Sequence, residues 1–101
     1  MQLARFLNNV FKKDGFILVD ANSKSYIIGN PKSENPIKLK ILNKNLHYKL
    51  LLHPDLYFGE AYTDGEIIIE NGTLTDFIDL SLMNFGRGEL NFFSYLINRL
   101  R

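Results

Sequence analysis

The chain has 101 residues, of which 46% are hydrophobic and 13% aromatic, and its net charge is +1. This length allows one domain with a modest core and excludes an additional cofactor-binding α/β enzyme domain, while the hydrophobic content excludes a disordered chain. The absence of cysteine excludes disulfides, thiolate zinc sites and cysteine nucleophiles, and it is compatible with the reducing cytoplasm. We therefore expect residues 1–101 to form a single folded domain.

Charge is unevenly distributed along the chain. Residues 1–50 contain nine Lys and Arg against three acidic residues, a net charge of +6, and residues 51–101 contain three Arg against eight acidic residues, a net charge of −5. A basic half predicts attraction to anionic phospholipid or nucleic acid. The alternative is that the two halves attract each other within one fold.

The first predicted element is an amphipathic helix that Gly15 ends. Its apolar stripe follows the helical spacing i, i+3, i+4, i+7 and i+8 and comprises Leu3, Phe6, Leu7, Val10 and Phe11. Two interpretations remain open: a helix packed on the core, or a membrane-surface helix with Lys12 and Lys13 as basic flanks. Polar residues interrupt this run, so it is no signal peptide, and no segment approaches the roughly 20 apolar residues that span a bilayer.

Three strands are expected next. Residues 16–20 and 26–29 are short β-branched or aromatic runs, and the five residues between them indicate a hairpin with a longer loop. Residues 30–36 are polar, contain two prolines and predict a loop. Beyond them, apolar residues 37, 39 and 41 alternate with lysines 38 and 40, which is typical of a strand with one buried face.

The second half alternates helices with one further strand. Residues 43–53 predict a helix capped by Asn43 or Asn45, and Pro54 closes it and opens a second short helix to Tyr62. A turn at 64–65 leads into a strand over residues 66–70. After the next turn, Thr73 with Asp76 predicts the start of a helix whose apolar stripe runs to Phe85. Gly86 and Gly88 end that helix, and a last helix follows with Phe93, Leu96, Ile97 and Leu100 on its core face.

These elements predict an α+β fold: a small, mostly antiparallel sheet of about four strands with amphipathic helices packed on one face.

The sequence offers few candidates for chemistry. The glycine pair in residues 86–88 lies between helices and does not follow a strand, so it predicts a connector and no phosphate site. His47 and His53 have no ligand partners at metal-site spacing. Glu60 and Asp64 lie four residues apart, as acid–base chemistry would need, but turn and docking roles account for them better.

Tyr57, Phe58 and Tyr62, with Tyr48 just upstream, form an aromatic cluster in the sequence. The cluster predicts either core packing or a surface for an acyl chain or another domain. Nucleic-acid binding is not expected, because the aromatic residues are not interleaved with lysines on one sheet face.

Residues 59–65, Gly-Glu-Ala-Tyr-Thr-Asp-Gly, carry a resemblance to a known family. Together with Leu51-Leu52 and Pro54 they resemble the G-E-[AS]-Y-M-D-G region in the N-terminal domain of cyclopropane-fatty-acyl-phospholipid synthases and related methyltransferases, with Thr63 in place of Met. The resemblance extends more loosely over the whole chain. Residues 64–77 are also similar to the end of sterol-carrier-protein-2-like domains, in which helices and a sheet surround an apolar cavity.

The resemblance implies an accessory domain that does not catalyse. In that family S-adenosylmethionine binding and methylene transfer belong to a separate C-terminal domain, so this chain is expected to hold no cofactor, no metal and no catalytic residue. Its implied partners are the catalytic methyltransferase domain and, transiently, an anionic phospholipid membrane, and the resemblance is compatible with a homodimer. The implied location is the cytoplasm, including the inner-membrane surface.

The expected contacts with lipid or with the catalytic domain combine the first helix with the aromatic and acidic stretch; they are Phe6, Phe11, Lys12, Lys13, Tyr57, Phe58, Glu60, Tyr62 and Asp64. The alternative to this function is a free-standing lipid carrier whose aromatic cluster lines a cavity, or a module that only mediates assembly or dimerisation.

Overall fold

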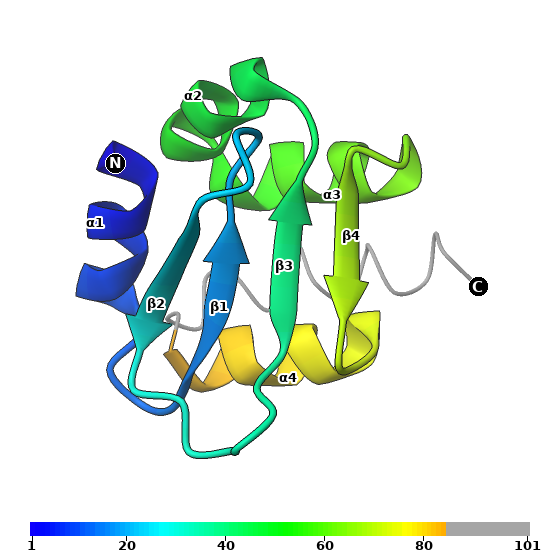
Figure 1. Cartoon of the computed structure of the whole chain (residues 1–101). Helices are drawn as coiled ribbons and strands as arrows, with labels where there is room; N and C mark the ends of the chain where they lie inside the picture. The colour runs from blue at the N-terminus through cyan, green and yellow to red at the C-terminus, as the bar shows by residue number, and fades with distance from the viewer. Residues whose placement is uncertain (85–101) are drawn as a thin grey trace.

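The computed structural model of the chain describes residues 1–84, apart from the side chains of residues 54 and 55 (Figure 1). Its elements are α1 (Gln2–Val10), β1 (Gly15–Val19), β2 (Ser25–Gly29), β3 (Lys38–Ile41), α2 (Lys44–Leu52), α3 (Pro54–Thr63), β4 (Ile67–Glu70) and α4 (Leu74–Asn84). The strands form one mixed sheet in the order β2-β1-β3-β4. β1 pairs with β2 and β3 with β4 in antiparallel fashion, and β1 pairs with β3 in parallel. The predicted α+β class with a mostly antiparallel sheet is confirmed.

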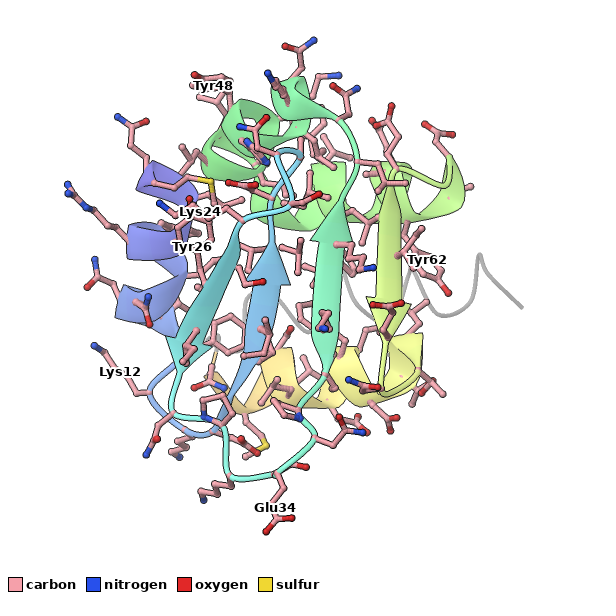
Figure 2. All side chains as sticks on the ribbon, viewed as in Figure 1. Lys12, Lys24, Tyr26, Glu34, Tyr48 and Tyr62 are labelled. Carbon is pink, nitrogen blue, oxygen red and sulfur yellow. The ribbon has the colours of Figure 1, made fainter. Side chains whose placement is uncertain are left out.

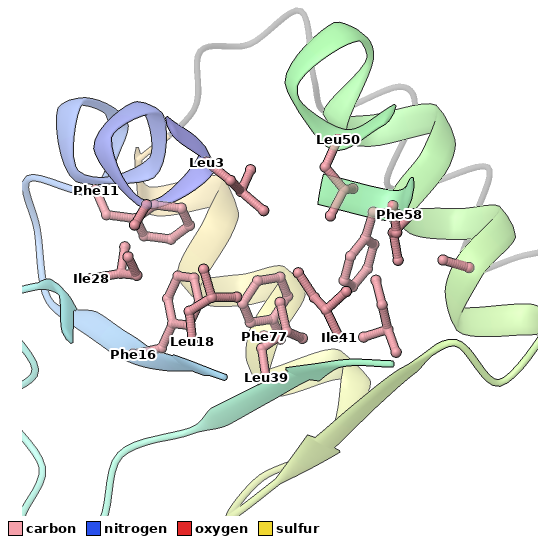
Figure 3. Packing of buried hydrophobic residues seen from close by; sticks show 14 of the residues in the cluster. Leu3, Phe11, Phe16, Leu18, Ile28, Leu39, Ile41, Leu50, Phe58 and Phe77 are labelled. Atoms are coloured by element: carbon pink, nitrogen blue, oxygen red, sulfur yellow. The ribbon is translucent and has the colours of Figure 1, made fainter. Parts of the chain in front are cut away.

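The core lies between one face of the sheet and the helices (Figure 3). Alternate residues of each strand point toward this core, as a strand with one buried face requires. Phe16 and Leu18 of β1 and Ile28 of β2 are fully buried, and Leu39 and Ile41 continue the same face in β3. The opposite face of the sheet carries no helix among residues 1–84 (Figure 1).

Aromatic rings fill the centre of this core. The ring of Phe16 meets Phe11 at 5.0 Å and Phe77 at 5.1 Å, both edge-on. Phe77 in turn stacks on Phe58 of α3 at 5.2 Å. Edge-on and stacked ring pairs add to the stabilisation that burial alone provides, so this chain of rings ties α3 and α4 to the sheet.

The predicted helix boundaries in the second half are largely confirmed. The side chain of Asn43 accepts a hydrogen bond from Asn45 N at 3.0 Å, so Asn43 is the cap of α2. Pro54 is the first residue of α3. At α4, Thr73 Oγ1 accepts from Asp76 N at 3.1 Å and Asp76 Oδ2 accepts from Thr73 N at 2.9 Å, which is a capping box with Asp in place of Glu.

The predicted end of the first helix is wrong. α1 ends at Val10, and Gly15 is the first residue of β1. A Cβ atom at Gly15 would overlap the carbonyl oxygen of Ile28 on the neighbouring strand, so glycine is required there for the close approach of β2. The expected stripe end at Phe85, the glycine connector over residues 86–88 and the last helix lie outside the described residues.

Candidate functional site

The expected contact residues near the N-terminus divide between core and surface. Phe11 is 2% exposed and packs on Phe16, while Phe6 is half-buried against the core. Lys12 and Lys13 have exposed side chains. Their backbone N–H groups both donate to Asn84 Oδ1 at 2.8 Å, which fixes the loop after α1 to the end of α4.

The expected contact residues on α3 divide in the same way. Phe58 is buried between Phe77 and Tyr62, whose ring stacks on it at 6.4 Å. Glu60 has an exposed side chain, and its carbonyl accepts from Asp64 N at 2.9 Å. Asp64 is therefore the exposed C-cap residue of α3, which agrees with its expected role at the turn.

The aromatic residues 48, 57, 58 and 62 do not form one cluster. Tyr57 is half-buried, and the Lys49 ammonium lies 5.7 Å from the centroid of its ring. Tyr48 lies on α2, is 67% exposed and projects away from the protein (Figure 2). The structure therefore brings Phe58 and Tyr62 together and leaves Tyr48 apart.

Both sides of α2 carry large apolar side chains. Leu46 and Leu50 are 2% and 6% exposed and pack on the core. Tyr48 and Leu52 are four residues apart, so they share one side of the helix, and they are 67% and 78% exposed. Large apolar side chains grouped on the exposed side of a helix mark a site of interaction. The outer side of α2 is thus a candidate contact surface.

The charged side chains of α2 are both basic. Lys44 and Lys49 are exposed, and α2 contains no acidic residue. The Glu66 carboxylate accepts a hydrogen bond from the Asn43 side chain at the N-cap. We call Lys44, Tyr48, Lys49 and Leu52 the α2 outer surface. Sequence patterns placed these residues on a helix but did not separate its two sides, because the leucines of α2 do not follow a single stripe.

The β1–β2 turn lies against α2. Ala21 N donates to His47 Nε2 at 3.4 Å, which joins the turn to the helix. Lys24 of the turn is exposed, and its ammonium lies 5.4 Å from the centroid of the Tyr26 ring. The turn therefore adds a further lysine at the end of the sheet where α2 sits (Figures 1 and 2).

Asp20 organises this turn. Its side chain is buried and accepts hydrogen bonds from Asn22 N and Lys24 N at 2.9 Å and from the Tyr26 hydroxyl at 3.2 Å. Burial by itself would raise the pKa of Asp20, but these hydrogen bonds, together with nearby His47, outweigh it and lower the pKa below 3.8. Burial and the Asp20 carboxylate raise the pKa of Tyr26 above 10.0. The charged carboxylate is thus an integral part of the turn.

A cleft of about 290 Å³ with a mixed polar and apolar lining, which includes Ile37, Leu80 and Met83, lies at the opposite end of the sheet. Asp14, Asp76 and Asp79 line it together with residues of the β2–β3 loop. Asp14 Oδ1 accepts from Gly15 N at 2.8 Å and from Lys32 N at 3.0 Å, and Asp76 caps α4. The carboxylates of Asp14 and Asp76 therefore hold backbone in place, and Asp79 is exposed. Within residues 1–84, no group of three or more His, Cys, Asp and Glu residues is arranged to hold a metal ion.

Comparisons with known proteins found no family whose sequence model matches the chain and no curated protein that matches it. None of the helices within residues 1–84 has the length and apolar content needed to cross a membrane.

Proposed function

We propose that this chain is an accessory domain of a S-adenosylmethionine-dependent methyltransferase similar to cyclopropane-fatty-acyl-phospholipid synthases. In this role it docks the catalytic domain and presents the acyl chains of membrane phospholipid to it, from the cytoplasmic side of the membrane. The resemblance of residues 59–65 supports the family, and the α+β fold is compatible with it. The cofactor and the chemistry belong to the catalytic domain.

One observation carries the membrane part of the proposal: charge is segregated within the folded chain. All nine Lys and Arg of residues 1–84 come from residues 1–50, and seven of the ten acidic residues come from residues 51–84. The cations lie on α1, the β1–β2 turn, β3, α2 and the intervening loops, and the acids of the second part lie on α3, β4 and α4 and next to them.

Most of the cations are available to a partner. Lys40 pairs with Glu70 at 3.2 Å across the β3–β4 pair, which supports attraction between the two halves at this point. The side chains with high exposure are those of Arg5, Lys12, Lys13, Lys24, Lys32, Lys44 and Lys49. Each lysine near an anionic membrane surface contributes about 1 kcal/mol of attraction, so the group at the α2 end of the sheet, Lys24, Lys44 and Lys49, favours an anionic phospholipid partner.

The filled core favours presentation at the surface over transport in an internal cavity. The rings of Phe11, Phe16, Phe77 and Phe58 follow one another at centroid distances of 5.0 to 5.2 Å. These rings occupy the space between sheet and helices in which a lipid carrier would hold an acyl chain. Among the alternatives, this packing gives the lipid-carrier function less support than the accessory function.

Vesicle co-sedimentation tests the proposal. We expect the chain to pellet with vesicles of phosphatidylglycerol and phosphatidylcholine at low ionic strength, and to be released at about 1 M salt, where the screening length falls to roughly 3 Å. Vesicles of phosphatidylcholine alone should bind little. Absence of binding to the anionic vesicles at low salt would overturn the membrane role. Calorimetric titration with S-adenosylmethionine should give no binding heat, and a saturable signal would contradict the accessory assignment.

A further inference from the structure

The α2 outer surface combines exposed apolar side chains with lysines, as helices at a membrane interface do. Tyr48 and Leu52 present apolar area on one side of the helix, at 67% and 78% exposure. Lys44 and Lys49 lie on the same short helix, and α2 contains no acidic residue. Helices that lie in the headgroup region bury aromatic and leucine side chains and keep lysines at the level of the phosphates.

We propose that the α2 outer surface is the part of this chain that enters an anionic bilayer. Tyr48 and Leu52 insert at the boundary between headgroups and acyl chains, and Lys44 and Lys49 contact lipid phosphates. This inference rests on the proposed membrane function and assigns it to one surface. It moves the contact away from α1, for which the sequence pattern left a membrane-surface role open, and away from the expected contacts on α3.

Packing among residues 1–84 explains why the outer side of α2, and not the apolar stripe of α1, is exposed for this contact. The apolar stripe of α1 is engaged by the protein, because Leu3 is 1% exposed and Phe6, Leu7 and Val10 pack against the core. On α2 the inward leucines Leu46 and Leu50 make the corresponding contacts. The second apolar pair of α2, Tyr48 and Leu52, does not pack in the core.

α2 is also held in a fixed orientation. The Asn43 side chain caps its first turn, and the bond from Ala21 N to His47 Nε2 joins its middle to the β1–β2 turn. A surface that is already ordered loses little conformational entropy on binding. Lys24 of the same turn adds positive charge at this end of the molecule (Figure 2).

The open face of the sheet is the competing apolar surface. Ile27 is 67% exposed, as Tyr48 is, and Ile68 is 43% exposed. The register places Ile68 opposite Lys40, whose ammonium is already paired with Glu70. Lys38 on the same face is half-buried, so this face combines a half-buried lysine with the Lys40–Glu70 pair, whereas both charged side chains of α2 are exposed lysines.

Tryptophan fluorescence tests the assignment, because the chain contains no tryptophan. We expect Y48W to shift to the blue on addition of the phosphatidylglycerol-containing vesicles and to be quenched by lipids brominated on the acyl chain. I27W is the matched control, because the two native side chains are equally exposed, and its spectrum should stay unchanged. Quenching of I27W without quenching of Y48W would overturn the assignment to α2.

Substitutions give an independent readout in the co-sedimentation assay. The double variant Y48S/L52S should bind the anionic vesicles about tenfold more weakly, and K44Q about fivefold more weakly. I27S and K32Q, exposed residues outside α2, serve as the apolar and charged controls. K12Q/K13Q tests the α1 alternative. It removes two charges, and its loss of binding per charge removed should not exceed the loss caused by K32Q.

The outcomes separate this inference from the proposed function. Salt-sensitive binding of the wild type, with no effect of Y48S/L52S and no quenching of Y48W, overturns the α2 surface and leaves the membrane function standing. Absence of wild-type binding overturns both. A blue shift of Y48W that rises with protein concentration without vesicles, together with a dimer in sedimentation, shows that a second copy covers α2 and also overturns the inference.

Discussion

Asn8 completes the outer edge of the sheet by binding the backbone of Gly29. Its Oδ1 accepts from Gly29 N at 2.8 Å, and its Nδ2 lies 3.5 Å from Ile27 O and 3.1 Å from Ala4 O. β2 is an edge strand, and unpaired backbone groups on such a strand invite pairing with another chain. The side-chain amide of Asn8 thus takes the place of a neighbouring strand and holds α1 against β2 (Figure 1).

Asn8→Ala should therefore weaken the fold and expose this edge. Loss of hydrogen bonds at a partly exposed site predicts a fall of about 1 kcal/mol in the free energy of unfolding, measured by urea denaturation. Asn9→Ala, a neighbouring exposed residue on the same helix, is the control and should cost less. Equal stability of the two variants would contradict a special role of Asn8.

Local chemistry explains how much of the fold was predictable from the sequence. Helix caps and proline positions act over three or four residues. Asn43, one of two candidate caps, Pro54 and the Thr73–Asp76 pair therefore marked the starts of α2, α3 and α4. The alternation of lysines with apolar residues around Leu39 likewise identified β3. These signals need no knowledge of distant partners.

Non-local packing decides what the sequence patterns could not predict. The parallel pairing of β1 with β3, which brings Leu18 opposite Leu39, depends on how the chain crosses the end of the sheet. A glycine at position 15 is typical of a helix end, yet glycine is required there because β2 passes close to its backbone. The outer position of Tyr48 is visible only once the core has taken Leu46 and Leu50.

The close approach of β2 at Gly15 predicts that alanine at this position lowers the free energy of unfolding strongly. In Gly15→Ala the new methyl group meets backbone atoms of β2, which cannot move without breaking the β1–β2 pair. We expect a loss of about 3 kcal/mol or more, measured by thermal or urea unfolding.

Gly65→Ala is the matched control for this prediction. Gly65 has φ +77 but nothing within 4 Å of an added Cβ, so only the left-handed conformation is penalised, at about 1 kcal/mol. The order of the two losses is therefore the test. A larger loss for Gly65→Ala than for Gly15→Ala would show that the approach of β2 is not restrictive.

The low pKa of Asp20 predicts a pH dependence of stability. Because the folded chain binds this proton less readily than the unfolded chain, the carboxylate stabilises the fold above its ordinary pKa of 3.8. This contribution is lost as the pH falls through the lower pKa of the folded state. Asp20→Asn keeps an acceptor oxygen without the charge, so its stability deficit relative to the wild type should shrink on acidification from about pH 7 to about pH 3.

Two further variants isolate the source of this pH dependence. Tyr26→Phe removes one of the three donors to Asp20, so its stability should depend on pH less than that of the wild type but more than that of Asp20→Asn. Asp79→Asn, which alters an exposed carboxylate of α4, should follow the wild-type curve. A constant difference between wild type and Asp20→Asn at all pH values would remove Asp20 as the cause.

The capping box of α4 predicts energetic coupling between Thr73 and Asp76. Each side chain accepts the backbone N–H of the other residue, at 2.9 and 3.1 Å, and each replacement by alanine should cost about 1 kcal/mol. Because the two bonds fix the same turn, the double variant should lose less than the sum of the single losses, by about 0.5 kcal/mol. Thr75→Ala, an exposed position in the same turn, controls for helix propensity. Strictly additive losses in the urea-unfolding cycle would mean that the two bonds form independently, and α4 would then begin with two separate caps.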